Sequence, residues 1–431
     1  MMKLFIRNFT ILLLLAASLL ESVVASASDL KKDYFVKLSA DNHLEYSQSA
    51  AGDLSFSAIS GLAYISDSYG LNDNILHRLA LGYGAFQIAL LNHEISGHGF
   101  RGVELGGEIE KINIGVFGGS ARTSNMGKTH FQERAVISLG GNETNYLLSQ
   151  KIANSLLEHN QPIDPIMGFG YIFSAGNQLF YTYFNSMGAG HDLKSYSDDM
   201  EKLYGSRSMT LGKIRSRGLL DMLDPVMLTS IYSAATGENV EIPRLQIADG
   251  FAISPFARNI LAPYGALETK VGAYIFTDYT PIKIGLSYGK QSKTRDVKEL
   301  TYHEEKTLKT LVLEGKVKSD NSWGHFTGLN AGGSLKNYTT YSADISIFKL
   351  FEVGNLKIGL DAAFWSQPEL FVQDPYRAKP KNGYMAILNG SYKFKENMSF
   401  IARAGYKTKG FVPGHFLDKT PILSIALQYK L

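Results

Sequence analysis

The chain has 431 residues, of which 45% are hydrophobic and 19% charged; this length and composition exclude an intrinsically disordered protein and allow two sizeable cores. Its 43 basic and 40 acidic residues are interspersed and give a net charge of only +3, so we expect no nucleic-acid partner. Because there is no cysteine, disulfides and thiolate ligands are excluded, and any metal must be held by His, Asp or Glu.

The first 27 residues have the three parts of a secretory signal peptide. Lys3 and Arg7 precede an apolar run from Ile11 to Leu20, and the small residues Ala-Ser-Ala at 25–27 end the segment. The apolar run is too short to span a bilayer comfortably as an uncleaved anchor. We therefore expect export with cleavage near residue 27, and the absence of disulfides favours a bacterial envelope.

Residues 71–243 mostly show the 3.6-residue period of helices. Helices are expected over 71–101, 131–159, 162–188 and 196–237, with a strand-like piece at 111–117. The pairs Asp164-Pro165 and Asp224-Pro225 indicate helix starts, since an acidic cap often precedes a first-turn proline. We predict a mainly helical domain over residues 28–250.

The strongest signal for chemistry is the segment Asn-His-Glu-Ile-Ser-Gly-His at 92–98, near the end of an apolar helix. Zinc hydrolysis requires neutral imidazoles to hold the ion, a carboxylate to take a proton from bound water, and an open coordination position. The histidines are five residues apart, which on a regular helix turns the second by roughly 140° from the first. A one-residue π-bulge would correct this, and Gly97 would accommodate it at little cost.

This segment resembles the His-Glu-x-x-Gly-His zinc motif of dipeptidyl-peptidase III-type metallopeptidases, which His93, Glu94, Gly97 and His98 match residue by residue. The resemblance covers positions 93–98. It implies that His93 and His98 are metal ligands and that Glu94 is the catalytic general base. Zinc is the expected metal, although imidazole and carboxylate groups suit other divalent ions as well.

In that family a glutamate on a later helix supplies the third ligand. We expect its counterpart to be Glu143, which lies in the predicted helix that ends near His159. Glu104 and Glu108 are nearer in sequence to the motif and remain alternatives.

A second polar pair, His191-Asp192, follows the uncharged segment 166–190. The pair could supply a ligand, a carboxylate that orients a ligand, or a proton donor to the transition state. We assign the catalytic role, that of the proton donor, to His191. Alternatively, Asp192 caps the next helix. The uncharged segment could span a bilayer, as in intramembrane metalloproteases of the site-2 type, but its amide side chains favour packing inside the protein or against a C-terminal barrel.

From about residue 250 onward the hydrophobic period changes to two, which indicates strands with one apolar and one polar face. Nine segments alternate in this way: 265–276, 282–290, 309–318, 323–333, 339–350, 356–365, 384–394, 398–406 and 421–431. A tenth strand is possible at 251–259. We therefore predict an α+β fold in which an antiparallel β-barrel of about 8–10 strands occupies residues 251–431.

The connections between these strands alternate between tight turns and mostly longer, polar loops. This pattern, with strands of about 9–11 residues, resembles outer-membrane β-barrel proteins. The resemblance implies contact with outer-membrane lipid and, from an even strand number, a helical domain that faces the periplasm. A water-soluble antiparallel sandwich or barrel would show the same alternation.

Together these features predict a zinc metallopeptidase, a hydrolase of the bacterial envelope in which water activated by Glu94 cleaves a peptide or protein substrate. The alternative is an outer-membrane binding or transport protein whose helical domain is structural or captures metal without catalysis. A wholly soluble secreted protein is the third interpretation.

Overall fold

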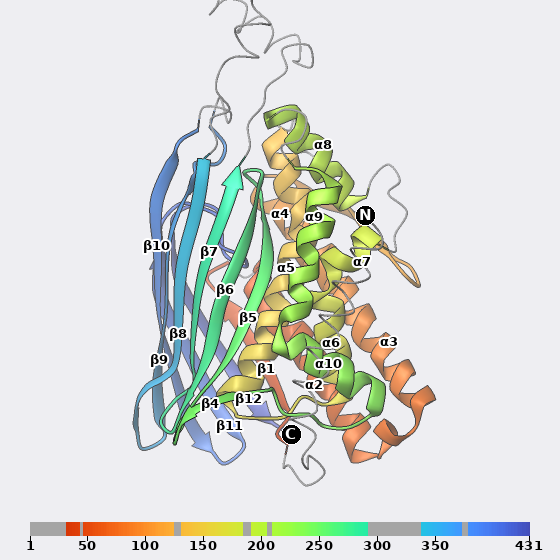
Figure 1. Ribbon diagram of the computed structural model, residues 1–431, viewed down its shortest axis with the longest axis vertical. Coiled ribbons are helices and arrows are strands. Elements are labelled where there is room, and N and C mark those ends of the chain that lie inside the picture. Colours follow the sequence, from red (N-terminus) through yellow and green to blue (C-terminus); the bar gives the residue numbers. More distant parts are fainter. Residues whose placement is uncertain are drawn as a thin grey trace, which may run out of the picture.

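A computed structural model of the chain describes residues 32–43, 46–124, 131–183, 191–204, 209–291, 338–372 and 378–431. The fold is α+β, as predicted: helices dominate the N-terminal half, and a large antiparallel sheet is built mainly from the C-terminal part (Figure 1). The expected signal peptide at 1–27 and the expected strands 309–318 and 323–333 lie outside the described residues.

Helices occupy most of the chain between residues 48 and 236. They are α2 (Gln48–Ser68), α3 (Ile75–Leu91), α4 (Phe100–Glu104), α5 (Phe131–Glu158), α6 (Pro165–Ala175), α7 (Asn177–Tyr183), α8 (Asp192–Tyr204), α9 (Leu211–Gly218) and α10 (Pro225–Thr236). Asp164 and Asp224 each precede a proline, and the side chain of each accepts hydrogen bonds from backbone N–H groups in the first turn of the helix that follows. Both predicted helix starts are therefore confirmed. The serine-rich helix α2 has no counterpart among the predicted helices.

The large sheet has ten strands in the order β1-β12-β11-β10-β9-β8-β7-β6-β5-β4, and every neighbouring pair is antiparallel. The strands are β1 (Phe35–Asp41), β4 (Leu245–Ala248), β5 (Phe251–Ala262), β6 (Ala266–Thr277), β7 (Ile282–Gln291), β8 (Tyr338–Val353), β9 (Leu356–Pro368), β10 (Pro380–Lys395), β11 (Met398–Lys407) and β12 (Thr420–Lys430). Two strands, β1 and β4, thus come from the part of the chain before residue 250.

The sheet is open, so the predicted closed barrel is wrong. Among the described residues, β1 and β4 are edge strands and do not pair with each other. Helices pack beside both ends: α2 against β1, and α10 with the 3₁₀ helix η3 (Leu219–Leu223) against β5. Alternation within a strand shows which face is apolar, but it does not show whether the first and last strands meet.

The two faces of the sheet differ from those of an ordinary soluble sheet, because apolar side chains are exposed on one face and charged side chains are buried on the other. On the face turned away from the helices, Leu286, Leu388 and Ile425 are 62%, 56% and 55% exposed. On the face that packs against the helices, Lys283 and Arg258 are buried, and they bond to Gln150 of α5 and to Asp224 respectively. The outer face is therefore apolar, while the inner face buries charged side chains among apolar ones such as Phe256 and Trp365.

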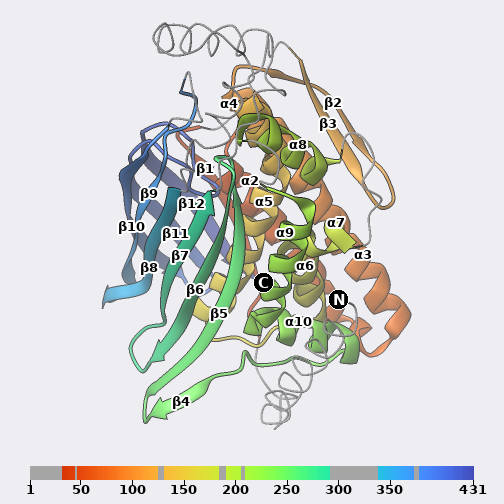
Figure 2. The same cartoon turned by 45° about the horizontal axis from the view of Figure 1, so that its top comes forward.

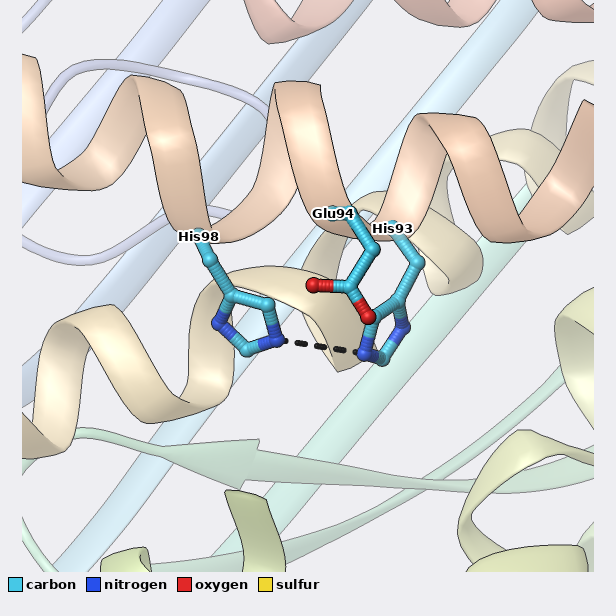
Figure 3. A group of neighbouring side chains, drawn as sticks. All are labelled: His93, Glu94 and His98. Atoms are coloured by element: carbon cyan, nitrogen blue, oxygen red, sulfur yellow. Dashed lines mark hydrogen bonds between the residues drawn. The ribbon is translucent and has the colours of Figure 1, made fainter. Parts of the chain in front are cut away.

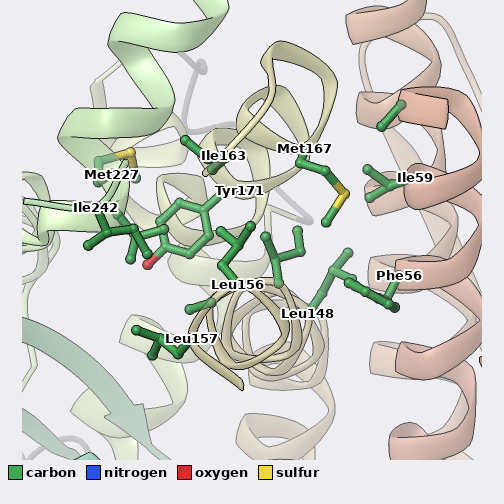
Figure 4. Close-up of a cluster of buried hydrophobic side chains, with 14 of the residues drawn as sticks. Phe56, Ile59, Leu148, Leu156, Leu157, Ile163, Met167, Tyr171, Met227 and Ile242 are labelled. Atoms are coloured by element: carbon green, nitrogen blue, oxygen red, sulfur yellow. The ribbon is translucent and has the colours of Figure 1, made fainter. Parts of the chain in front are cut away.

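The main apolar core lies among the helices and extends to strands β1, β5 and β6 through Phe35, Phe256 and Tyr274. Phe56 and Ile59 of α2 meet Leu148 and Leu156 of α5, and α6 and α10 complete the cluster (Figure 4). Part of the uncharged segment 166–190 forms α6, which packs against α3, α5 and α10. Within the described ranges, no helix is both long and apolar enough to cross a membrane.

A two-stranded hairpin stands apart from the large sheet. Its strands β2 (Glu108–Ile114) and β3 (Gly119–Ser124) pair antiparallel and project beside α8 (Figure 2). The first strand overlaps the strand-like piece that the sequence predicts at 111–117. The hairpin follows directly on the helix that carries the His-Glu motif, so it lies next to the candidate site.

Candidate metal centre

The predicted deviation from a regular helix is confirmed. Between α3 and α4, residues Asn92–Gly99 form a π-helix, η2. A π-helix pairs residue i with residue i+5, which is the spacing between His93 and His98. Both side chains therefore project from the same face, with their Nε2 atoms 3.2 Å apart (Figure 3).

Close backbone packing holds this π-helical turn against α5. A Cβ atom at Gly97 would lie 2.5 Å from Cα of Gly141, and one at Gly141 would lie 2.5 Å from Cδ2 of His93. Both distances are far below van der Waals contact. Gly97 is thus required because two backbones touch there, in addition to the conformational freedom for which the sequence singled it out.

Asp192, the first residue of α8, supplies a third donor. Its Oδ2 atom lies 3.0 Å from Nε2 of His93 and 3.1 Å from Nε2 of His98. Three ligands held tetrahedrally at 2.0–2.1 Å from one zinc ion would be separated by roughly 3.3 Å. The two imidazoles and the Asp192 carboxylate therefore fit a single zinc-sized ion with little movement.

The far side of each imidazole is also held. Ile137 of α5 accepts a hydrogen bond from Nδ1 of His98 at 2.7 Å, and the side-chain amide of Asn145 lies 3.1 Å from Nδ1 of His93. Such partners fix the ring orientation of metal-ligating histidines. The Nδ1–H of His98 donates to a carbonyl, so its Nε2 lone pair is left to face the shared position. The His93 ring has the same form once the Asn145 amide turns its Oδ1, which has no partner among the described residues, toward Nδ1–H.

The charges of the cluster are strongly coupled. Burial lowers the pKa of His98, but Asp192 and Glu94 outweigh it and raise that pKa to about 9. Burial raises the pKa of Asp192, yet the two imidazoles bring it well below its ordinary value. The anionic carboxylate thus attracts positive charge to this position, which a divalent cation supplies more fully than a proton.

Glu94 lies beside the ligands without being hydrogen-bonded to them. Its carboxylate is buried, accepts a hydrogen bond from the backbone of Ala121 in β3, and lies within 4.8 Å of the histidine nitrogens. Burial raises its pKa above the ordinary value, while His98 and His93 oppose the rise. A carboxylate at this distance has room for one water molecule between it and an ion.

Glu143, expected as the third ligand, is outside the cluster. Its carboxylate pairs with Arg101 and accepts a hydrogen bond from the backbone N–H of Gly414 at 2.8 Å. Residues two positions apart on a helix point about 200° apart, so Glu143 faces away from the side of α5 where Gly141 and Asn145 meet His93. The alternatives are also elsewhere: Glu104 pairs with Arg101, and Glu108 is exposed on β2.

His191 and Tyr181 border the same position. The ring of Tyr181 in α7 stacks on His93 at 5.7 Å, and its hydroxyl lies 3.4 Å from Nε2 of His93. Burial, with Asp192 and Glu94 nearby, raises the pKa of Tyr181 well above its ordinary value, so it keeps its proton. His191 packs edge-on against Tyr181, and its ring nitrogens have no partner among the described residues. The sequence contained no signal that distinguishes Tyr181 from the chain's other tyrosines.

No protein-family model, curated protein or solved structure matches this chain. The likeness to dipeptidyl-peptidase III-type enzymes therefore remains a match of one short motif.

Proposed function

We propose that the protein is a zinc-dependent peptidase whose ion is held by His93, His98 and Asp192. The observation that carries this proposal is the buried set of three donor atoms 3.0–3.2 Å apart, beside a carboxylate that is not one of them. Three protein ligands with an open fourth position are typical of catalytic rather than structural zinc sites. Other divalent ions fit the same donors.

The roles of the side chains follow from their positions. A bound divalent ion would polarise a carbonyl group and lower the pKa of water. Glu94 accepts the proton of the attacking water and passes it to the departing amine. Tyr181, which keeps its proton, donates a hydrogen bond to the oxygen that becomes negative. His191 faces the same space, and burial lowers its pKa so that it is neutral and able to exchange a proton.

The decisive experiment separates metal binding from hydrolysis. Glu94→Gln should keep the wild-type zinc content by elemental analysis and lose at least a hundredfold in peptide hydrolysis, because only the base is removed. The matched control is Glu108→Gln, which changes an exposed glutamate and should alter neither quantity. If wild type binds zinc and cleaves nothing, the protein captures metal without catalysis; if Glu94→Gln hydrolyses normally, the proposed mechanism is wrong.

We further propose that the outer face of the sheet contacts outer-membrane lipid, as the sequence led us to expect of an exported protein. The support is the exposed apolar face described above, which a protein surrounded by water would not favour over such an area. Strands such as β7 and β12, with 10 and 11 residues, match a tilted bilayer crossing.

An open sheet in lipid must satisfy the backbone groups of its edges. Helix α2 does this for β1. The Ser60 hydroxyl accepts a hydrogen bond from the backbone N–H of Phe35 at 3.0 Å. The Ser57 hydroxyl accepts one from the backbone N–H of Lys37 at 2.7 Å and donates one to the carbonyl of Lys37. On its outward side α2 exposes the apolar residues Leu54 and Ile65. Helix α2 therefore continues the wall of the sheet with an apolar outer surface.

The position of the loops favours one orientation. The long connections include 369–379 and 408–419, and these contact the helical part near the metal centre, through Gln132 to Phe371 and Glu143 to Gly414. At the opposite end of α5, Phe35 stacks on His159 beside the C-terminal strand. The longer loops of outer-membrane proteins lie outside the cell. We therefore propose that the metal centre faces the exterior, whereas the even number of strands in the sequence led us to expect that it faces the periplasm.

A further inference from the structure

A cleft of about 470 Å³ lies directly against the metal centre. One end is polar and is formed by His93, Asp192 and His191, with Tyr181 beside them. The rest of the lining is mainly apolar, with the amides of Asn145 and Asn177 as its polar members; the apolar residues are Phe86, Ala89, Leu90, Phe117, Phe173 and Phe180. This volume is within the range of about 300–1,000 Å³ of ligand pockets, so the cleft has room for a side chain and its flanking backbone.

The aromatic wall is assembled from three helices. The rings of Phe86 in α3 and Phe173 in α6 meet edge to face at 5.0 Å, and Phe173 lies 6.3 Å from Phe180 in α7. Such offset and edge contacts hold aromatic rings in fixed relative positions. The wall therefore exists before any ligand arrives.

The hairpin forms the opposite side. The carbonyl of Val116 accepts hydrogen bonds from the hydroxyl of Tyr83 at 3.0 Å and from the side-chain amide of Gln87 at 2.8 Å. These contacts tie the tip of the hairpin to α3, so that Phe117 and the following glycine pair border the cleft. The absence of a Cβ at Gly119 also leaves space for the Glu94 carboxylate, which a side chain would overlap.

The chemistry of the lining is selective. Apart from Asp192 and the histidines of the centre, none of the residues that form the cleft carries a charge. A carboxylate of the substrate placed against the phenylalanines would lose its hydration without gaining a cationic partner. An aromatic or large aliphatic side chain would instead gain contact area and ring packing.

From this geometry we infer that the cleft selects peptides with a large apolar residue, best an aromatic one, next to the bond that is cleaved. The inference rests on the proposed peptidase function and adds its substrate class. Phe173 is the residue that determines specificity, because its ring contacts those of both Phe86 and Phe180 and lies at the centre of the wall.

The test uses zinc-loaded full-length protein and peptides that differ only at the residue beside the cleaved bond, with Phe, Leu, Ser or Asp there. We expect kcat/KM for the Phe peptide to be at least tenfold higher than kcat/KM for the Ser peptide and about a hundredfold higher than kcat/KM for the Asp peptide. Phe173→Ala should reduce the Phe/Ser ratio at least tenfold, and Phe173→Leu should restore part of it.

Phe169→Ala is the matched control, since Phe169 is on the same helix and stacks on Phe173 but does not line the cleft. It should leave the Phe/Ser ratio unchanged even if the protein becomes less stable. If wild type cleaves the Asp peptide as fast as the Phe peptide, or if Phe173→Ala keeps the wild-type ratio, the inference is wrong while the peptidase proposal stands. If no peptide is cleaved at all, the peptidase proposal itself fails.

Discussion

Replacing Gly141 by alanine should disable the metal centre without touching a ligand. The added Cβ would lie 2.5 Å from Cδ2 of His93. The two backbones cannot shift further together, because they are already so close that a Cβ at Gly97 would lie 2.5 Å from Cα of Gly141. Either the imidazole leaves the shared position or η2 and α5 separate. Overpacking of this kind costs about 1–3 kcal/mol of folding stability, and misplacing a ligand should weaken zinc binding by about 10–100-fold or more.

The assay is a zinc titration of metal-free protein against a competing chelator, with thermal unfolding measured in parallel. Gly61→Ala is the matched control, because the space around Gly61 on α2 is open and alanine there should stabilise the helix by up to about 1 kcal/mol. A Gly141→Ala protein with wild-type zinc affinity would refute the geometry described for the centre.

Four further substitutions test other parts of the structure. Glu143→Gln should keep zinc but lower the free energy of unfolding by about 3–5 kcal/mol, because it leaves Arg101 buried without its full partner; elemental analysis and denaturant unfolding check this. Tyr181→Phe should keep zinc and lower kcat at least tenfold in peptide hydrolysis. Leu388→Arg should destabilise folding into phospholipid vesicles by about 2–4 kcal/mol. Ser60→Ala should cost about 1–3 kcal/mol in the same vesicles by leaving the edge of β1 unsatisfied.

The geometry of the histidine pair could be predicted because it follows from local spacing. Two ligands five residues apart cannot share an ion on a regular helix, so the sequence required the extra residue per turn that η2 contains. The strands could be predicted for a similar reason: the alternation at 282–290, 356–365 and 421–431 coincides with β7, β9 and β12 to within a few residues.

The third donor could not be predicted with certainty because it depends on tertiary packing. Asp192 and Glu143 are both acidic residues of later helices, and only the rotation of α5 and the placement of α8 decide between them. The sequence did single out His191-Asp192 as a polar pair that could contribute a ligand. Tyr181 lies in an uncharged stretch, and nothing in its neighbours indicates that its ring stacks on His93.

The open form of the sheet follows from the volume of what it must hold. A closed barrel of ten strands, spaced about 4.8 Å apart and tilted by about 40°, has a radius of roughly 10 Å at its backbone. After its inward side chains are counted, the interior would admit at most one helix of about 10–12 Å diameter. The core of this protein joins α2, α5, α6 and α10 in one cluster. The strands can therefore curve around α5 only if the sheet stays open, with a gap that accommodates α2, α6 and α10. That gap also allows α3 and η2 to bring His93 and His98 to a cleft beside the sheet, where a closed barrel would have sealed them from solvent.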